Sequence, residues 1–296
     1  MELTSSLRAL YAPGVAYEIA TPDCAIPDMV VEVAARYPSR AAIDFFARTL
    51  TYSQLVADMR RCAGALHQAG VRPGDRVALV IPNCPQHAVA VLGTMLLGAI
   101  VLEHNPLAPA EELRGEYGRH GARVTIAWSK SLDKLTFLGR GHTTFALDLT
   151  TALPAASRLA LRLPLKAARE KRDMLSSPHP RWVRSWARAL RDATPWEGSC
   201  PAAADDVALL IHTGGTTGVP KAAALTHANL MANVEESIAW VPVLHEGAEV
   251  FYCILPLFHA FGFTIGFLAG LRMGATIAMF PKFDTAMVLT AQRRLP

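Results

Sequence analysis

A repeat of apolar residues at helical spacing covers residues 50–70, the most clearly marked element of the chain. The repeating positions match one face of a helix and are Leu55, Met59, Cys62, Leu66 and Ala69. Thr51 and Gln54 have capping-box spacing, in which each side chain binds the backbone N–H of the other residue. Gly70 is a typical residue at which a helix stops. The pattern predicts a helix over Leu50–Gly70.

Apolar strands and helices alternate through much of the chain. Strands are expected at Arg76–Ile81, Ile100–His104, Val124–Trp128, Val207–His212, Phe251–Leu255 and Ala275–Phe280. Helices are expected at Pro85–Leu97, Pro109–His120 and Thr285–Arg294. This order predicts an α/β fold of mostly parallel sheets flanked by helices. On such sheets ligands collect beyond the carboxyl ends of the strands.

The longest apolar runs do not predict a membrane-spanning helix. Ala88–Leu102 is too short, and Thr264–Phe280 is interrupted by Arg272. Met1–Ala20 lacks the basic start and continuous apolar block of a secretory signal. The five cysteines show neither metal-ligand nor redox spacing and are Cys24, Cys62, Cys84, Cys200 and Cys253. We therefore expect buried thiols, no metal ligands and a reducing, cytoplasmic location.

Positive charge is concentrated in one stretch. The chain has a net charge of +4, whereas residues 157–191 alone hold ten Lys or Arg and two Asp or Glu. The remainder is net acidic, which argues against a nucleic-acid partner. Leu159–Arg172 and Arg181–Arg191 could each form a basic amphipathic helix suited to peripheral contact with the inner face of the membrane or to an acidic partner. The alternative, which we favour, is a solvated excursion between two sheet segments.

These shifts in composition suggest a division of the chain into four parts. Residues 1–25 form an N-terminal extension and residues 26–150 a first α/β subdomain. Residues 151–204 form the basic excursion. Residues 205–296 form an α/β segment that contains the phosphate-loop candidate described next.

Candidate chemistry is concentrated in Thr213–Lys221, which reads Thr-Gly-Gly-Thr-Thr-Gly-Val-Pro-Lys. Glycines allow backbone N–H groups to turn toward an anion, and hydroxyls and a lysine add further donors. The segment follows a predicted strand, and a strand, glycine-rich turn and helix form the usual phosphate-binding context. It differs from the common nucleotide loop because Pro220 precedes the lysine and Ala222 follows it. A plain surface loop is the alternative for the glycines taken alone.

Thr213–Lys221, with Leu225-Thr226-His227 after it, resembles the signature of the acyl-adenylate-forming ligases, which include acyl-CoA synthetases, peptide-synthetase adenylation domains and luciferases. Further segments similar to that family occur in the same order: Thr51–Leu55, Gly74–Ala78, Pro82–Pro85, Gly98-Ala99, Asn105-Pro106 and Leu255–Gly262. The resemblance runs from about Ile26 to the end of the chain. Gly214-Gly215, where Ser-Gly is commoner, resembles the bacterial long-chain fatty-acid CoA ligases in particular.

The resemblance implies a two-step reaction that uses ATP, Mg2+ and coenzyme A. A fatty-acid carboxylate attacks the α-phosphorus of ATP, releasing pyrophosphate, and the coenzyme A thiol then displaces AMP. The residues that would grip the β- and γ-phosphates are Thr213, Gly214, Gly215, Thr216, Thr217, Gly218 and Lys221. Lys221 would offset charge on the leaving pyrophosphate.

The same resemblance assigns a second group of residues to the acyl side of the site. His259 would face the carboxylate or the acyl-adenylate, and Phe258 would line the acyl pocket. A core histidine at a strand end is the alternative for His259. For His227 we favour packing at a helix start, and His212 would only pack. A nucleophilic Cys253 has no support, because no neighbouring residue in the sequence would lower its pKa.

Two departures from the family pattern leave alternative functions open. Ala222 stands where many members have glycine, so its methyl group could crowd the backbone. The later family motifs for adenine, ribose and the catalytic lysine of the C-terminal domain do not occur, so the resemblance covers an N-terminal portion. We expect these 296 residues alone not to complete adenylation at a normal rate. The alternatives are an inactive remnant that binds phosphate or acyl ligands, a membrane-surface module, and an adenylating enzyme for another carboxylic acid.

Overall fold

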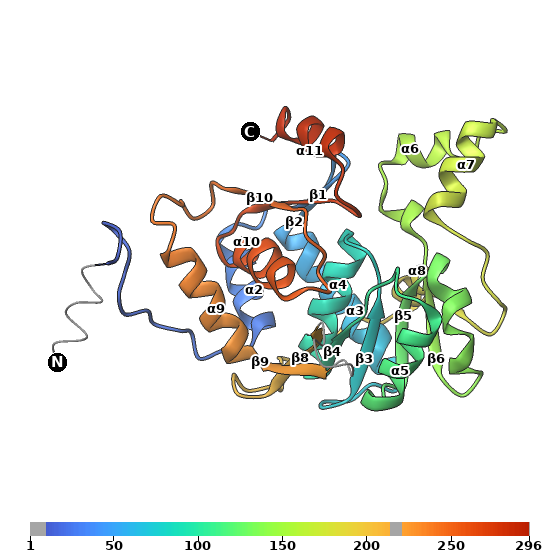
Figure 1. Cartoon of the computed structure of the whole chain (residues 1–296), viewed down its shortest axis with the longest axis horizontal. Coiled ribbons are helices and arrows are strands. Elements are labelled where there is room, and N and C mark those ends of the chain that lie inside the picture. Colours follow the sequence, from blue (N-terminus) through green and yellow to red (C-terminus); the bar gives the residue numbers. More distant parts are fainter. Residues whose placement is uncertain (1–9, 214–220, 296) are drawn as a thin grey trace.

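Two β-sheets with helices between and around them make up the protein (Figure 1). This computed structural model describes residues 10–213 and 221–295. The layers run in the order α5, large sheet, α2 with α3 and α4, small sheet, α11. The α/β fold with mostly parallel sheets is therefore as predicted.

The large sheet has seven strands in the order β7-β6-β5-β3-β4-β8-β9. All neighbours are parallel except β8 and β9, which are antiparallel. The strands are β3 (Arg76–Val80), β4 (Ile100–Glu103), β5 (Val124–Trp128), β6 (Thr143–Leu147), β7 (Arg184–Ser185), β8 (Val207–Thr213) and β9 (Lys221–Thr226).

The small sheet has four strands in the order β10-β11-β1-β2. It combines strands from early and late parts of the sequence, because β1 pairs in parallel with β11. The strands are β1 (Ala41–Phe45), β2 (Arg48–Thr51), β10 (Val250–Cys253) and β11 (Thr276–Met279). Only the β1–β2 pair is antiparallel.

Both faces of the large sheet are covered by helices. Val77 and Leu79 of β3 belong to the main core, whereas Ala78 and Val80 belong to a second core under α5. Complete burial on both faces explains why this strand lacks alternation in the sequence. The helices are α2 (Ile26–Arg36), α3 (Tyr52–Gln68), α4 (Pro85–Leu96), α5 (Ala110–His120), α6 (Ala155–Ala160), α7 (Lys166–Leu175), α8 (Trp186–Asp192), α9 (His227–Ala239), α10 (Gly270–Arg272) and α11 (Thr285–Gln292).

The described residues also contain helical segments that are not α-helices. They are two 3₁₀ segments, η1 (Ser129–Leu138) and η2 (Leu149–Ala152), and one π-helical segment, η3 (Gly262–Ala269). π-Helical turns are rare and concentrate near functional sites. This one begins three residues after His259.

Predicted and observed elements agree closely along the first half of the chain. The capping box of Thr51 and Gln54 is present, and α3 begins at Tyr52 because Leu50 and Thr51 belong to β2. The strand predicted over Val124–Trp128 has those bounds in the structure.

The expectation that the glycine-rich segment leads into a helix is wrong. The residues after it form β9, which pairs antiparallel with β8, and α9 begins only at His227. Because β9 is an edge strand paired on one side only, its small residues Ala222–Ala224 do not show the apolar pattern of a central strand.

The basic segment divides into two structurally different parts. No residue of α6 or α7 is buried. By contrast, β7 pairs with β6, and α8 packs on α3 with Trp186 buried. The second part is thus a component of the large sheet layer and not a solvated excursion.

Within residues 10–213 and 221–295, no helix has both the length and the apolar character needed to cross a membrane. The apolar run at Thr264–Phe280 instead contains η3, α10 and β11.

Candidate functional site

The carboxyl ends of three parallel strands meet at one edge of the large sheet. Leu79, Glu103 and Ile211 lie side by side in register on β3, β4 and β8. The residues that follow these positions therefore come together: Asn83 after β3, His104 after β4, and His212 and Thr213 at the end of β8. Ligands of parallel sheets bind at such an edge.

The glycine-rich signature is held at both ends by this edge. Thr213 ends β8 and is the ladder partner of Lys221, which opens β9. The segment therefore spans two adjacent strand ends, with the exposed residue Lys221 at its exit. The predicted phosphate-binding residues Gly214, Gly215, Thr216, Thr217 and Gly218 lie outside the described residues. Their phosphate contacts, and those of Thr213 and Lys221, stay a prediction.

Phe258 and His259 lie on the turn that follows β10, at the carboxyl edge of the small sheet. Their ring centroids are 4.6 Å apart, and His259 is exposed. The alternative of a core histidine is therefore wrong for His259. Gly262 allows the turn to close, because a Cβ there would collide with the Pro256 carbonyl oxygen. The acyl-facing roles of Phe258 and His259 stay a prediction.

Asn83 connects these two edges, a role that the sequence analysis did not assign. Its Nδ2 donates to the carbonyl oxygens of Leu255 at 2.9 Å and Cys253 at 3.4 Å. Its Oδ1 accepts from the Leu257 backbone N–H at 2.9 Å. The side chain is buried, and it fixes the start of the turn that carries Phe258 and His259. The only signal in the sequence was its place in the Pro82–Pro85 segment.

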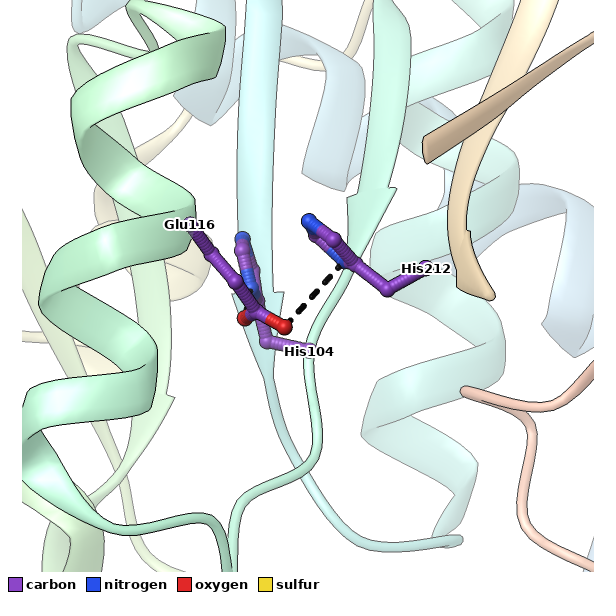
Figure 2. Close-up of side chains that lie close together, drawn as sticks. All are labelled: His104, Glu116 and His212. Atoms are coloured by element: carbon purple, nitrogen blue, oxygen red, sulfur yellow. Dashed lines mark hydrogen bonds and ion pairs between the residues drawn. The ribbon is translucent and has the colours of Figure 1, made fainter. Parts of the chain in front are cut away.

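A histidine–carboxylate cluster, in which His104 and Glu116 are buried and His212 is partly buried, lies at the end of β8 (Figure 2). Glu116 of α5 points its carboxylate toward both His104 and His212, whose ring centroids lie 4.9 Å apart. His104 Nδ1 donates to Glu116 Oε2 at 2.6 Å, and His212 Nδ1 lies 3.8 Å from Glu116 Oε1. His212 Nδ1 also donates to the Glu103 backbone oxygen at 3.1 Å. The cluster thus ties α5, β4 and the strand that leads into the signature.

Burial keeps His104 and the adjacent His120 neutral. Burial lowers the pKa of His104, and the opposing effect of Glu116 is smaller. Burial, together with the nearby His104, His212, Arg76 and His142, lowers the pKa of His120 to about 3. His104 is therefore a neutral donor to Glu116. His212, expected only to pack, is also part of a hydrogen-bonded network.

Among the described residues, one group of this kind has the composition of a metal site. The ligand atoms of His104, Glu116 and His212 lie within 4.8 Å of one another. Two ligands of one tetrahedral zinc ion lie about 3.3 Å apart, given bonds of about 2.0–2.1 Å. His104 and Glu116 approach to 2.6 Å, which is a direct hydrogen bond. Nor does the set suit Mg2+, which prefers oxygen ligands. We interpret the cluster as a hydrogen-bonded support.

Two further predictions concern groups outside this edge. His227 is the first residue of α9, is buried, and accepts from the Ile26 backbone N–H at 3.2 Å, which confirms its packing role. The Cys253 thiol is also buried, and burial raises its pKa to about 12. A thiolate nucleophile at Cys253 is thus excluded at neutral pH, in agreement with the sequence analysis.

Comparison with known proteins matches residues 30–294 to the AMP-binding enzyme family. The chain is 30% identical over 283 residues to the long-chain-fatty-acid–CoA ligase of Bacillus subtilis strain 168, covering 93% of this chain and 50% of that protein. It is 32% identical over 252 residues to 4-coumarate–CoA ligase 2 of Oryza sativa subsp. japonica, covering 83% and 42%.

Solved structures support the same fold. A putative long-chain-fatty-acid CoA ligase from Rhodopseudomonas palustris CGA009 superimposes with a TM-score of 0.74 at 23% identity, covering 92% of this chain and 62% of that one. A benzoate CoA ligase from Burkholderia xenovorans LB400 gives 0.72 at 21% identity, covering 90% and 47%. The chain belongs to the AMP-binding enzyme family, and it spans about half the length of the curated relatives it matches.

Proposed function

We propose that this chain supplies the nucleotide-phosphate and acyl-facing part of an ATP-dependent fatty-acid CoA ligase. The observation that carries the proposal is the position of the family signature. It joins two neighbouring strand ends at the carboxyl edge of the sheet, with Lys221 opposite Thr213. The long-chain-fatty-acid–CoA ligase of Bacillus subtilis, which matches 93% of the chain, supports the choice of substrate class.

The adenylation step requires these residues to hold the phosphates and to offset the charge on the departing pyrophosphate. The β- and γ-phosphates of ATP must be held while a carboxylate attacks the α-phosphorus, and donors placed in advance do this best. Backbone amides between Thr213 and Lys221 would supply donors, and the Lys221 ammonium would offset charge on departing pyrophosphate. Mg2+ would arrive with the nucleotide and be held mainly by phosphate oxygens. Coenzyme A would then displace AMP.

His259 and Phe258 would meet the acyl group from the other sheet. His259 is exposed on a turn that Asn83 holds to the carboxyl edge of the large sheet. An imidazole there can donate to a carboxylate or to the acyl-adenylate carbonyl oxygen. Phe258, in contact with His259, would line the start of the acyl pocket.

Replacement of Lys221 tests the phosphate role. In the Lys221→Ala variant, loss of a charge-assisted contact worth about 1.5–3 kcal/mol should weaken ATP binding roughly 10- to 100-fold. The melting temperature should change little, because Lys221 is at an exposed position. Isothermal titration calorimetry with Mg-ATP measures the affinity. Lys282→Ala, another exposed lysine, is the matched control and should bind as the parent chain does. Equal affinity in both variants would remove the phosphate role.

A second candidate is an adenylating enzyme for an aromatic acid. The 4-coumarate–CoA ligase 2 of rice, 32% identical to the chain, favours it. Exchange of labelled pyrophosphate into ATP in the presence of palmitate, 4-coumarate or benzoate separates the two candidates. ATP binding without exchange for any acid would instead support a chain that binds nucleotide and leaves activation to residues it does not contain.

A further inference from the structure

Two short helices stand apart from the layered body of the protein (Figure 1). They are α6 and α7, joined by residues 161–165, and we call residues 155–175 the basic hairpin. Neither helix buries a residue. Leu161 of the connection is buried and holds the hairpin against the core.

The outer surface of the basic hairpin combines exposed apolar and cationic side chains. Leu159, Leu163, Leu165 and Met174 are 49–66% exposed. Two acidic residues, Glu170 and Asp173, make only exposed ion pairs of 3.9 Å. They are outnumbered by six cations, which are Arg158, Arg162, Lys166, Arg169, Lys171 and Arg172. Three of these apolar side chains, Leu159, Leu163 and Leu165, fall within one seven-residue stretch, and exposed apolar side chains that are gathered in one place mark interaction sites.

The basic hairpin is also fixed in place. Trp128 Nε1 donates to the Leu175 backbone oxygen at 2.8 Å, and the Ser177 N–H donates to Ser129 Oγ at 3.0 Å. Lys130 Nζ donates to the Asp173 backbone oxygen at 2.6 Å. These contacts attach α7 to the carboxyl end of β5. The parallel strands β5, β3, β4 and β8 share that edge of the sheet, so the hairpin rises from the same edge as the signature segment.

We propose that the basic hairpin binds the surface of an anionic phospholipid membrane. Apolar side chains of a basic surface helix enter the boundary between headgroups and acyl chains, while Lys and Arg stay with the phosphates. The four apolar side chains are exposed to solvent, and the pocket beside α7 is lined by Arg172 and Asp173 but by none of these four. An anionic lipid surface accepts exposed apolar side chains and also balances the positive charge, so it fits the basic hairpin better than a folded acidic protein does.

The structure narrows the expectation drawn from the sequence. Residues 181–191 share the basic composition, but their β7 and α8 are attached to the large sheet and Trp186 is 1% exposed. Trp186 thus cannot insert into a bilayer, and the membrane contact moves to residues 155–175. This proposal goes beyond the ligase function and does not depend on it.

Flotation with vesicles tests the proposal without nucleotide or acyl substrate. The intact chain should float with vesicles of phosphatidylcholine and phosphatidylglycerol in about 0.1 M salt, and much less in about 0.5 M salt. Each cation contributes roughly fivefold to binding at an anionic surface, so the Arg162→Glu, Arg169→Glu, Lys171→Glu triple variant should lose at least about 100-fold. Leu163→Ser with Leu165→Ser should weaken binding while leaving the charge unchanged.

The matched control is Arg181→Glu, Arg188→Glu, Arg191→Glu. It changes the net charge equally, at exposed positions outside the basic hairpin, and should retain most of the binding. Circular dichroism verifies that each variant is folded. Absence of flotation by the parent chain, an equal loss in the two charge variants, or no effect of the leucine changes would each overturn the proposal.

Discussion

Asn83 makes three of the hydrogen bonds that join the two sheets. Its buried side chain serves one backbone donor and two backbone acceptors on the segment from Cys253 to Leu257. Substitution by alanine would leave these groups without their partner in a place with little access to water. A buried backbone group that loses its partner costs about 1–3 kcal/mol.

We therefore expect Asn83→Ala to lower the free energy of unfolding by about 2–4 kcal/mol. Urea denaturation followed by circular dichroism measures the loss. Gln86→Ala provides a comparison three residues away, because Gln86 is half-buried and makes one side-chain hydrogen bond, to Thr151. If the two variants lost equal stability, the bridging role of Asn83 would be wrong.

Individual residues also show which roles could be predicted from the sequence. The packing role of His227 was predicted, because it sits one residue after a helix cap, and local spacing reveals caps. Asn83 was not assigned a role, since its partners are 170 and more residues away in the sequence. Glu116 and His212 are also far apart in the sequence, and only the order of the strands in the sheet brings them together. The phosphate contacts of Gly214–Gly218 stay predictions drawn from the resemblance.

At the scale of elements, α5 is attached to the site edge through Glu116. The carboxylate accepts from His104 at the end of β4 and lies near His212 at the end of β8. Substitution of Glu116 by glutamine keeps the shape of the side chain and removes its charge. The amide oxygen accepts a weaker hydrogen bond than a carboxylate does.

We expect Glu116→Gln to lower the free energy of unfolding by about 1–3 kcal/mol, measured by urea denaturation. Glu112→Gln is the control on the same helix, where the side chain is exposed and its loss should cost less than about 1 kcal/mol. A loss at Glu116 no greater than at Glu112 would show that the cluster does not support the edge.

Elements were predictable where the local pattern decides them. The helix α3 has a capping box and a clear apolar face, and β5 is a mostly apolar strand in which Thr125 is the one polar residue. The strand β9 was missed because its residues Ala222–Ala224 favour helix in isolation. Its extended conformation comes from pairing with β8, whose Ile211 and His212 are its ladder partners. Pairing of this kind is a tertiary effect that local propensity does not contain.

At the scale of the whole molecule, several histidines are buried in a neutral state. Burial lowers the pKa of His227 to about 4, with Asp206 opposing the shift only weakly. Burial, with smaller contributions from neighbouring basic side chains, lowers the pKa of His120 to about 3. Burial shifts the pKa values of His104 and His142 in the same direction.

The sign of the pH effect follows from these shifts. Below the ordinary histidine pKa of 6.5, these histidines bind protons in the unfolded chain but stay unprotonated in the folded chain. The stability contributed by the neutral histidines is therefore complete above pH 6.5 and is lost as the pH falls toward 4. Each such group contributes a slope of up to about 1.4 kcal/mol per pH unit.

Urea denaturation between pH 7.5 and 4.5 should thus show a free energy of unfolding that falls steeply below about pH 6.5. His227→Gln removes one titrating group and keeps a side-chain oxygen that can accept from Ile26, so the slope should decrease by about 1.4 kcal/mol per pH unit near pH 5. His245→Gln, at an exposed position, provides the comparison variant. An unchanged slope in the His227 variant would mean that this histidine is protonated in the folded chain. The helix start that it supports against Ile26 would then need a different explanation, because a protonated Nδ1 cannot accept that N–H.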